Sequence, residues 1–112
     1  MLGAVHEATW AALGDPKRRA VLGLLRERPR TVTELVGALR LTQPATSKHL
    51  RVLREAGLVR VRPEAQRRVY ALDPAPLAEL DAWLAPYRAL WNDRLDALGR
   101  HLDGTTGETR ET

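Results

Sequence analysis

Apolar residues recur three and four positions apart in two stretches near the start of the 112-residue chain, which is the spacing of one helix face. The first stretch, Val5–Leu13, predicts a short helix. A second helix is expected to begin at Asp15-Pro16, because aspartate can cap a helix and proline fits its first turn, and to end before Pro29. Its apolar stripe comprises Ala20, Val21, Leu24 and Leu25.

The next two helices are separated by a turn of only three residues, numbers 40–42. Thr33 is the expected N-cap of the first of them, which ends near Leu39. Thr42 is the expected cap of the second, which covers Thr42–Ala56 and ends at Gly57 in a left-handed conformation. Two helices joined by so short a turn have the dimensions of a helix-turn-helix.

Residues 58–72 change to the alternating pattern of β-strands. Apolar and basic side chains alternate over residues 58–62, which predicts a half-buried strand. Residues 63–66 form the expected turn, and residues 67–72 the returning strand. The pattern therefore predicts a mainly α fold with a small β-hairpin, arranged as a winged helix-turn-helix domain.

The remaining apolar positions form one long helical stripe over about seven turns. Pro86 lies within it and favours a kink or a break into two helices. Residues 104–112 contain no large apolar side chain and are expected to be disordered. The stripe comprises Leu77, Leu80, Leu84, Tyr87, Trp91, Leu95, Leu98 and Leu102.

A stripe of eight apolar residues is too long to bury against a module of this size, and exposed it would promote aggregation. Pairing with the same stripe of a second copy would bury it in a two-fold interface. Trp10, on the first helix, is expected to contribute further apolar surface to this interface. We therefore expect a homodimer, with segments 1–14 and 74–103 as dimerisation helices of a single domain, 1–103.

The helix over Thr42–Ala56 has two chemically different faces. Thr46, Leu50 and Leu53 share one side and are expected to pack on the preceding helices. The opposite side carries hydroxyl, amide and cationic groups in its first two turns, where a recognition helix contacts base edges and the helix dipole attracts phosphate. This asymmetry predicts that residues 15–72 are a DNA-binding module.

Within this module, Gln43 suits adenine, while Lys48 and Arg51 suit guanine or a phosphate. Arginines near the hairpin tip suit a minor groove, where negative potential is focused. The candidate DNA-binding residues are Gln43, Pro44, Ser47, Lys48, His49 and Arg51 of the helix, and Arg62, Arg67 and Arg68 of the hairpin.

Each candidate also has a purely structural interpretation. Thr46 and Ser47 can satisfy neighbouring backbone groups instead of binding DNA. His49 lies between the two faces, which favours packing or a phosphate contact over base recognition. Arg67 and Arg68 can be solvated surface charges. The sequence leaves these alternatives open.

Charge is unevenly distributed along the chain. Residues 15–68 hold 14 Lys/Arg and 5 Asp/Glu, a net charge of +9, whereas residues 69–112 carry a net charge of −4. Such asymmetry indicates that one part meets a polyanion while another part has a different role, although a solvated basic surface would give the same totals. The acidic C-terminal segment also argues against a helix that lies on anionic lipid.

Several classes of function lack their characteristic residues. The chain has no cysteine, and its three histidines, His6, His49 and His101, are scattered, so we expect no metal site, no cofactor and no catalytic centre. No apolar run approaches the roughly 18 residues of a membrane span, and the N-terminus lacks a signal-peptide pattern. These features are typical of a cytoplasmic protein without membrane partners.

Three sequence runs closely resemble the ArsR/SmtB family of bacterial winged-helix regulators: ALGDPKRRAVLGLL, TVTELVGALRLTQPATSKHLRVLREAGLV and RRVYALDP. The resemblance covers about residues 8–73 and is most specific over Leu41–Val59. It implies a repressor that binds double-stranded DNA and dimerises through its terminal helices. The cysteine pair or Asp/His set of metal-sensing members is missing, so the inducing effector, such as a small molecule, stays unidentified.

A winged-helix domain can also bind protein instead of DNA, because fold alone does not decide function. An adaptor of that kind would more often carry apolar or acidic residues at positions 48, 51, 67 and 68, where this chain has four cations. The basic face therefore favours DNA.

Overall fold

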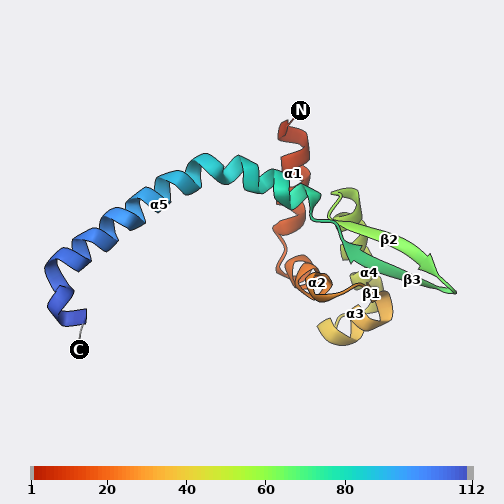
Figure 1. The fold of residues 1–112 in the computed structure, drawn as a ribbon. Helices are drawn as coiled ribbons and strands as arrows, with labels where there is room; N and C mark the ends of the chain where they lie inside the picture. Colours follow the sequence, from red (N-terminus) through yellow and green to blue (C-terminus); the bar gives the residue numbers. More distant parts are fainter. Residues whose placement is uncertain (1, 111–112) are drawn as a thin grey trace. The chain divides into compact units, whose positions relative to one another are not determined.

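The computed structural model describes the backbone of residues 2–110 and the side chains of residues 7–102. It divides into two compact units, one ending at Leu80 and the other beginning at Asp81. The elements, labelled in Figure 1, are α1 (Leu2–Leu13), α2 (Pro16–Glu27), β1 (Arg30–Thr31), α3 (Val32–Leu39), α4 (Gln43–Glu55), β2 (Val59–Glu64), β3 (Arg67–Leu72) and α5 (Ala75–Arg110).

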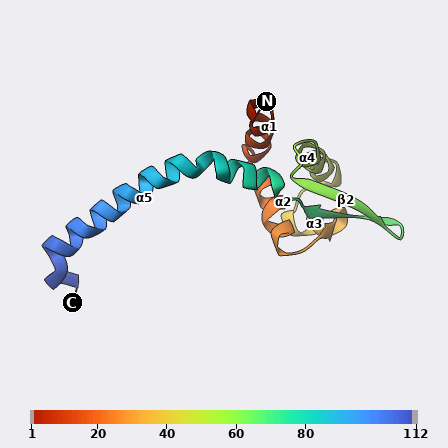
Figure 2. The same ribbon diagram turned by 45° about the horizontal axis from the view of Figure 1, so that its top comes forward.

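The first unit is a winged helix-turn-helix, as the sequence predicts. Helices α2, α3 and α4 contact one another, α1 contacts α2 and α4, and α4 contacts β2. Both views show α4 beside the hairpin formed by β2 and β3 (Figure 1, Figure 2). The core of this unit is built from Ala12, Val21, Leu22, Leu25, Leu35, Leu50, Leu53, Leu58, Val59 and Tyr70.

Helix α2 begins where the sequence predicts. The Asp15 carboxylate accepts hydrogen bonds from the backbone amides of Lys17 (2.7 Å) and Arg18 (3.3 Å), and Pro16 occupies the first turn. The apolar stripe is rotated slightly from the expected one, because Leu22 is buried and Ala20 is exposed. Helix α4 is followed by Gly57 at a φ of 79°, as its role at the helix end requires.

The start of α3 corrects the sequence prediction. The N-cap is Thr31 and not Thr33: the Thr31 hydroxyl accepts a hydrogen bond from the Glu34 amide (3.2 Å), and the Glu34 carboxylate accepts one from the Thr31 amide (2.8 Å). This reciprocal pair satisfies two backbone donors that a helix start leaves open. Thr33 is exposed within the first turn.

The sheet also has a strand that the sequence analysis missed. Its order is β1-β3-β2, with Thr31 of β1 opposite Val69 and Arg30 opposite Tyr70. The first hairpin strand continues two residues further toward the tip than expected, because Glu64 pairs with Arg67 and only Ala65-Gln66 remain as the loop, whereas the second strand has its expected bounds. Ala65 has a φ of 57°, the left-handed conformation that two-residue hairpin loops demand.

Helix α5 is continuous through Pro86, so the alternative of a break into two helices is not realised. The helix extends to Arg110 and so includes residues 104–110 of the segment for which the sequence predicts disorder, while residues 111 and 112 lie outside the described part of the chain. At its start, Leu80 is buried and Leu77 packs against the core of the first unit.

Candidate nucleic-acid interface

The inward face of α4 is fixed by its cap and by three buried side chains. The Thr42 hydroxyl accepts a hydrogen bond from the Ala45 amide (3.2 Å), which caps the helix. Thr46 is fully buried, and its hydroxyl donates to the Thr42 carbonyl (2.9 Å). Leu50 and Leu53 are buried one and two turns further along. Thr46 therefore has the structural role that the sequence left open.

The outward face of α4 consists of polar and cationic side chains. Gln43, Pro44, Ser47, Lys48 and Arg51 are all exposed. In the part of the chain that the structure describes, no carboxylate forms an ion pair with Lys48 or Arg51. The structure thus brings five of the six candidate residues of this helix to one exposed surface with unneutralised positive charge.

His49, the sixth candidate, is oriented differently. It is half-buried, and its Nδ1 lies 3.5 Å from a terminal guanidinium nitrogen of Arg18 on α2. This position fits the packing interpretation better than base recognition. The sequence could not identify the contact, because the two residues are 31 positions apart.

The hairpin carries the other three candidates, and their charges are not equivalent. Arg62 and Arg67 both lie near the carboxylate of Glu64, at 3.4 and 3.2 Å. Arg68 is exposed and has no ion pair with the described residues. Glu64 therefore neutralises part of the positive charge at the hairpin tip.

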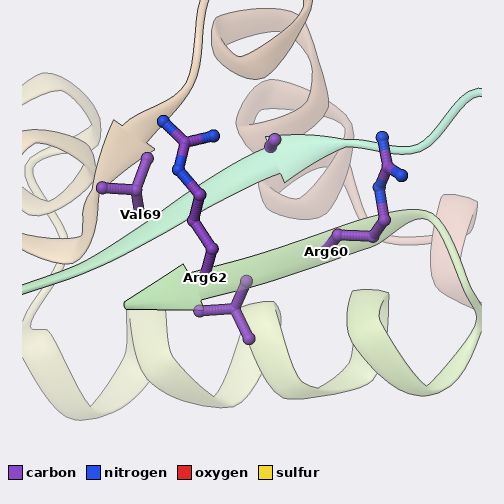
Figure 3. Close-up of a pocket in the computed structure, with 5 residues that line it drawn as sticks. Arg60, Arg62 and Val69 are labelled. Atoms are coloured by element: carbon purple, nitrogen blue, oxygen red, sulfur yellow. The ribbon is translucent and has the colours of Figure 1, made fainter. Parts of the chain in front are cut away.

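Arg60 is a cation of the hairpin that the sequence analysis did not include among the candidates. Figure 3 shows Arg60 and Arg62 projecting from β2 to the same side of the hairpin, where they flank a hollow of about 310 Å³. Arg60 lies 3.7 Å from Asp73, so it is also partly neutralised. The alternation of residues 58–62 already contained the signal, since residues 60 and 62 must share a face.

A second hollow lies where the N-terminus of α4 meets the hairpin. Its volume is about 650 Å³, and Gln43 of α4 and Gln66, Arg67 and Arg68 of the hairpin line it together with residues 31–34. The hollow therefore brings a candidate base-reading residue and two candidate wing residues to one concave surface.

Two carboxyl groups near this surface have lowered pKa values. Burial raises the pKa of Asp15, but hydrogen bonds from the Lys17 and Arg18 amides outweigh it, with further contributions from His49 and the Arg18 guanidinium. The Thr31 amide lowers the pKa of Glu34, against a smaller opposing effect of burial. Both carboxylates belong to helix caps, so their charges stabilise the frame that holds α4.

In the second unit, the apolar residues of α5 are largely exposed. The Trp83 and Tyr87 rings lie 5.0 Å apart. Trp91, Leu95, Leu98 and Leu102 expose between 44 and 60% of their surface. Trp10 of the first unit is 45% exposed. Leu80 and Leu77 of the expected dimer stripe are instead buried or packed within one chain, and Leu84 is half-buried.

Two other classes of site lack their characteristic features among the described residues. No three His, Asp or Glu side chains among residues 7–102 come close enough together to hold a metal ion. None of the helices, over the same residues, combines the length and apolar character needed to cross a membrane.

Comparison with known proteins agrees with this arrangement. Residues 15–61 match the family described as "Bacterial regulatory protein, arsR family". The chain is 39% identical over 103 residues to the HTH-type transcriptional regulator Rv2034 of Mycobacterium tuberculosis, which covers 92% of this chain and 94% of that protein. It is 41% identical over 69 residues to the HTH-type transcriptional repressor SmtB of the same species, covering 62% of this chain and 51% of that protein.

Solved structures give the same result. An ArsR-like transcriptional regulator from Rhodococcus sp. RHA1 is 28% identical with a TM-score of 0.71, covering 87% of this chain and 92% of that one. The homodimeric winged helix-turn-helix DNA-binding domain of Mb0332 from Mycobacterium bovis is 26% identical with a TM-score of 0.65, covering 79% and 82%. The chain therefore belongs to the ArsR/SmtB family of winged helix-turn-helix transcriptional regulators, which bind DNA.

Proposed function

We propose that this chain is a transcriptional repressor that binds an inverted-repeat operator as a homodimer. Helix α4 lies in the major groove, and the hairpin of β2 and β3 contacts the neighbouring backbone or minor groove as a wing. The observation that carries the proposal is the outward face of α4, where Gln43, Ser47, Lys48 and Arg51 are exposed and the two cations lack a carboxylate partner among the described residues.

The residues of this face have separate roles in the proposal. Gln43, in the first turn, pairs with an adenine edge, and Lys48 or Arg51 donates to guanine. Ser47 donates to a phosphate, which the positive end of the α4 dipole also attracts. Pro44 makes apolar contact at the groove wall. Arg68 is the strongest wing contact, because Glu64 partly neutralises Arg62 and Arg67.

The dimer is supported by the exposed apolar residues of α5, of which Trp91 and Leu95 are 44 and 60% exposed in the single chain. Tyr87, Leu98 and Leu102 of α5 are exposed as well, and Leu84 contributes its exposed part. In the first unit, Trp10 adds exposed apolar area of its own. Two-fold pairing would present two α4 helices to successive major grooves, about 34 Å apart, which requires an inverted repeat. The relative SmtB is named a repressor, and the domain from M. bovis is described as homodimeric.

The test is to select operator fragments from random DNA with the purified chain, and then to compare Lys48→Ala with Lys17→Ala. These are the only two lysines, and both are exposed, but Lys17 lies at the start of α2. Lys48→Ala should reduce the free-energy difference between operator binding and random-DNA binding by about 1–3 kcal/mol, the value of a good base contact. Lys17→Ala should leave that difference unchanged.

Two results would contradict the proposal. A selection that enriches no inverted repeat would contradict operator recognition. The second result has two parts. An unchanged preference of Lys48→Ala for the operator would show that Lys48 makes no base contact, and a nearly flat salt dependence would show that few phosphates are contacted, since each neutralised phosphate adds about −0.9 to the log–log slope.

A further inference from the structure

The C-terminal end of α1 is held by one arginine of the next helix. The last carbonyls of a helix have no partner within it and form the negative end of its dipole. The Arg18 guanidinium donates to two of them, from Nε to the Ala12 carbonyl (2.7 Å) and from a terminal nitrogen to the Ala11 carbonyl (3.0 Å). Arg18 also lies 3.8 Å from the carboxylate of Asp15.

The same guanidinium reaches helix α4. Its other terminal nitrogen lies 3.5 Å from His49 Nδ1. A guanidinium has only donors, so a hydrogen bond in this contact requires the His49 tautomer in which Nδ1 is the acceptor. His49 occupies the turn of α4 that directly follows Thr46, and it is adjacent to the exposed Lys48. Arg18 therefore joins the end of α1 to the DNA-facing half of α4.

The Arg18 side chain is largely enclosed by its surroundings. The Arg18 side chain is only 18% exposed, and α1 contacts both α2 and α4. A partly buried guanidinium with several fixed partners loses little further conformational freedom when it holds the helices together, because its planar fork is already oriented.

The neighbouring Arg19 lacks the second half of this arrangement. It also donates to the end of α1, from a terminal nitrogen to the Leu13 carbonyl (2.7 Å), but it is exposed and makes no hydrogen bond or ion pair with α4 among the described residues. Both arginines therefore hold the end of α1, but only Arg18 also contacts His49 of α4.

We infer that Arg18 is a positioning residue that sets the orientation of the recognition helix α4 through His49, and that it makes this orientation depend on the end of α1. The inference rests on the proposed function, in which α4 binds DNA. A change in the last turn of α1 moves the Arg18 guanidinium, and α4 then meets the major groove at a different angle. The end of α1 is accordingly a place from which DNA affinity can be regulated.

The experiment compares Arg18→Gln with Arg19→Gln in the full-length chain, using the selected operator across a range of salt concentrations. Both variants remove one positive charge and contacts to the end of α1. Arg18→Gln should weaken operator binding about tenfold, since a hydrogen bond from a charged group contributes at about that level. Arg19→Gln should stay within about twofold, the range of an ordinary surface substitution.

The salt dependence separates positioning from direct contact. If Arg18 acts through α4, the number of neutralised phosphates is unchanged, and the log–log slope for Arg18→Gln equals that of the wild type. A slope that is smaller by about 0.9 for each Arg18 in the complex would show a direct phosphate contact and overturn the inference. Unchanged affinity would overturn it as well.

A double-mutant cycle with His49→Ala tests whether Arg18 affects operator binding through His49. If Arg18 acts through His49, the double variant binds no more weakly than the weaker-binding single variant, whereas independent effects multiply and would overturn the inference. Should Arg18→Gln fail to fold by circular dichroism, Arg18→Lys replaces it, because lysine keeps the charge and loses the fork. A wild-type chain that binds no operator would instead refute the proposed function, so the two failures are distinguishable.

Discussion

The two units of this chain use the same apolar spacing with opposite results. In the unit that ends at Leu80, residues three and four positions apart become a closed core, and Leu35, Leu53 and Leu58 are fully buried. In the unit that begins at Asp81, no described side chain up to Leu102 is buried, and Leu95 remains 60% exposed. A periodic pattern thus identifies the apolar face of a helix, but not whether that face is buried within the chain.

The largest expected effect comes from removing a core leucine of the first unit. Leu53→Ala should lower the free energy of unfolding by about 2–5 kcal/mol, because it leaves a cavity in a fully packed site. Chemical denaturation measures this value. The matched variant Leu95→Ala should change the unfolding of the first unit by less than about 0.5 kcal/mol. Equal losses for the two variants would abolish the distinction between the units.

The second effect concerns the exposed face of α5. Trp91→Glu should dissociate the proposed dimer and weaken operator binding by at least about 2 kcal/mol, the loss typical of a central interface residue. Sedimentation velocity and operator titration measure the two changes. Asn92→Glu introduces the same charge at the adjacent exposed position and should retain the dimer. A Trp91→Glu monomer with full operator affinity would separate dimerisation from function.

The third effect tests the corrected start of α3. Thr31→Ala should lower the free energy of unfolding by about 1 kcal/mol through loss of the cap, and Thr33→Ala should leave it nearly unchanged. Thermal unfolding compares the two threonines directly. A larger loss of stability for Thr33→Ala than for Thr31→Ala would show that Thr33 is the N-cap, as the sequence predicts.

The same cap has a pH dependence of definite sign. Since the pKa of Glu34 is below its ordinary value in the folded chain, its contribution to stability is complete above the ordinary pKa and is lost as the pH falls through the folded pKa. Glu34→Gln should therefore remove part of the loss of stability in acid while leaving the basic limb unchanged. An identical acid limb for the variant and the wild type would contradict this role.

The smallest effect comes from the hairpin tip. Glu64→Gln releases Arg62 and Arg67 from their shared carboxylate and should strengthen DNA binding by about 0.5–1 kcal/mol for all sequences, the scale of an exposed ion pair. The salt slope should rise at the same time. Glu79→Gln, which removes the same charge from an exposed position of α5, should change neither quantity. A weaker affinity for Glu64→Gln would show that the ion pairs orient the arginines for DNA.

Local signals made most of the first unit predictable. Asp15, Thr42 and Gly57 act at helix ends through contacts within a few residues, and the structure confirms each of these roles. Alternation over residues 58–72 predicted the hairpin for the same reason. The alternation also placed Arg60 beside Arg62, although Arg60 was not recognised as a candidate.

Two of the features that sequence reasoning missed involve partners distant in the sequence. Strand β1 has two residues, too few to form a pattern, and exists because Val69 and Tyr70 pair with it. His49 lies beside Arg18, 31 positions away. Two other missed features are local, and one of them is the ion pair between Glu64 and Arg67 across the loop. The cap at Thr31 was missed because Thr33 has the same side chain two positions later, and only the hydrogen-bond geometry distinguishes them.

The most direct test of the account is the stoichiometry of the complex on a selected operator. Analytical ultracentrifugation should compare the intact inverted repeat with a duplex in which one half-site is scrambled. We predict two chains on the intact repeat, bound cooperatively, and an affinity for the scrambled duplex lower by at least about 3 kcal/mol, because several base contacts of one α4 are lost. A single chain bound with equal affinity to both duplexes would contradict the proposal that the first unit reads DNA while the second pairs two copies.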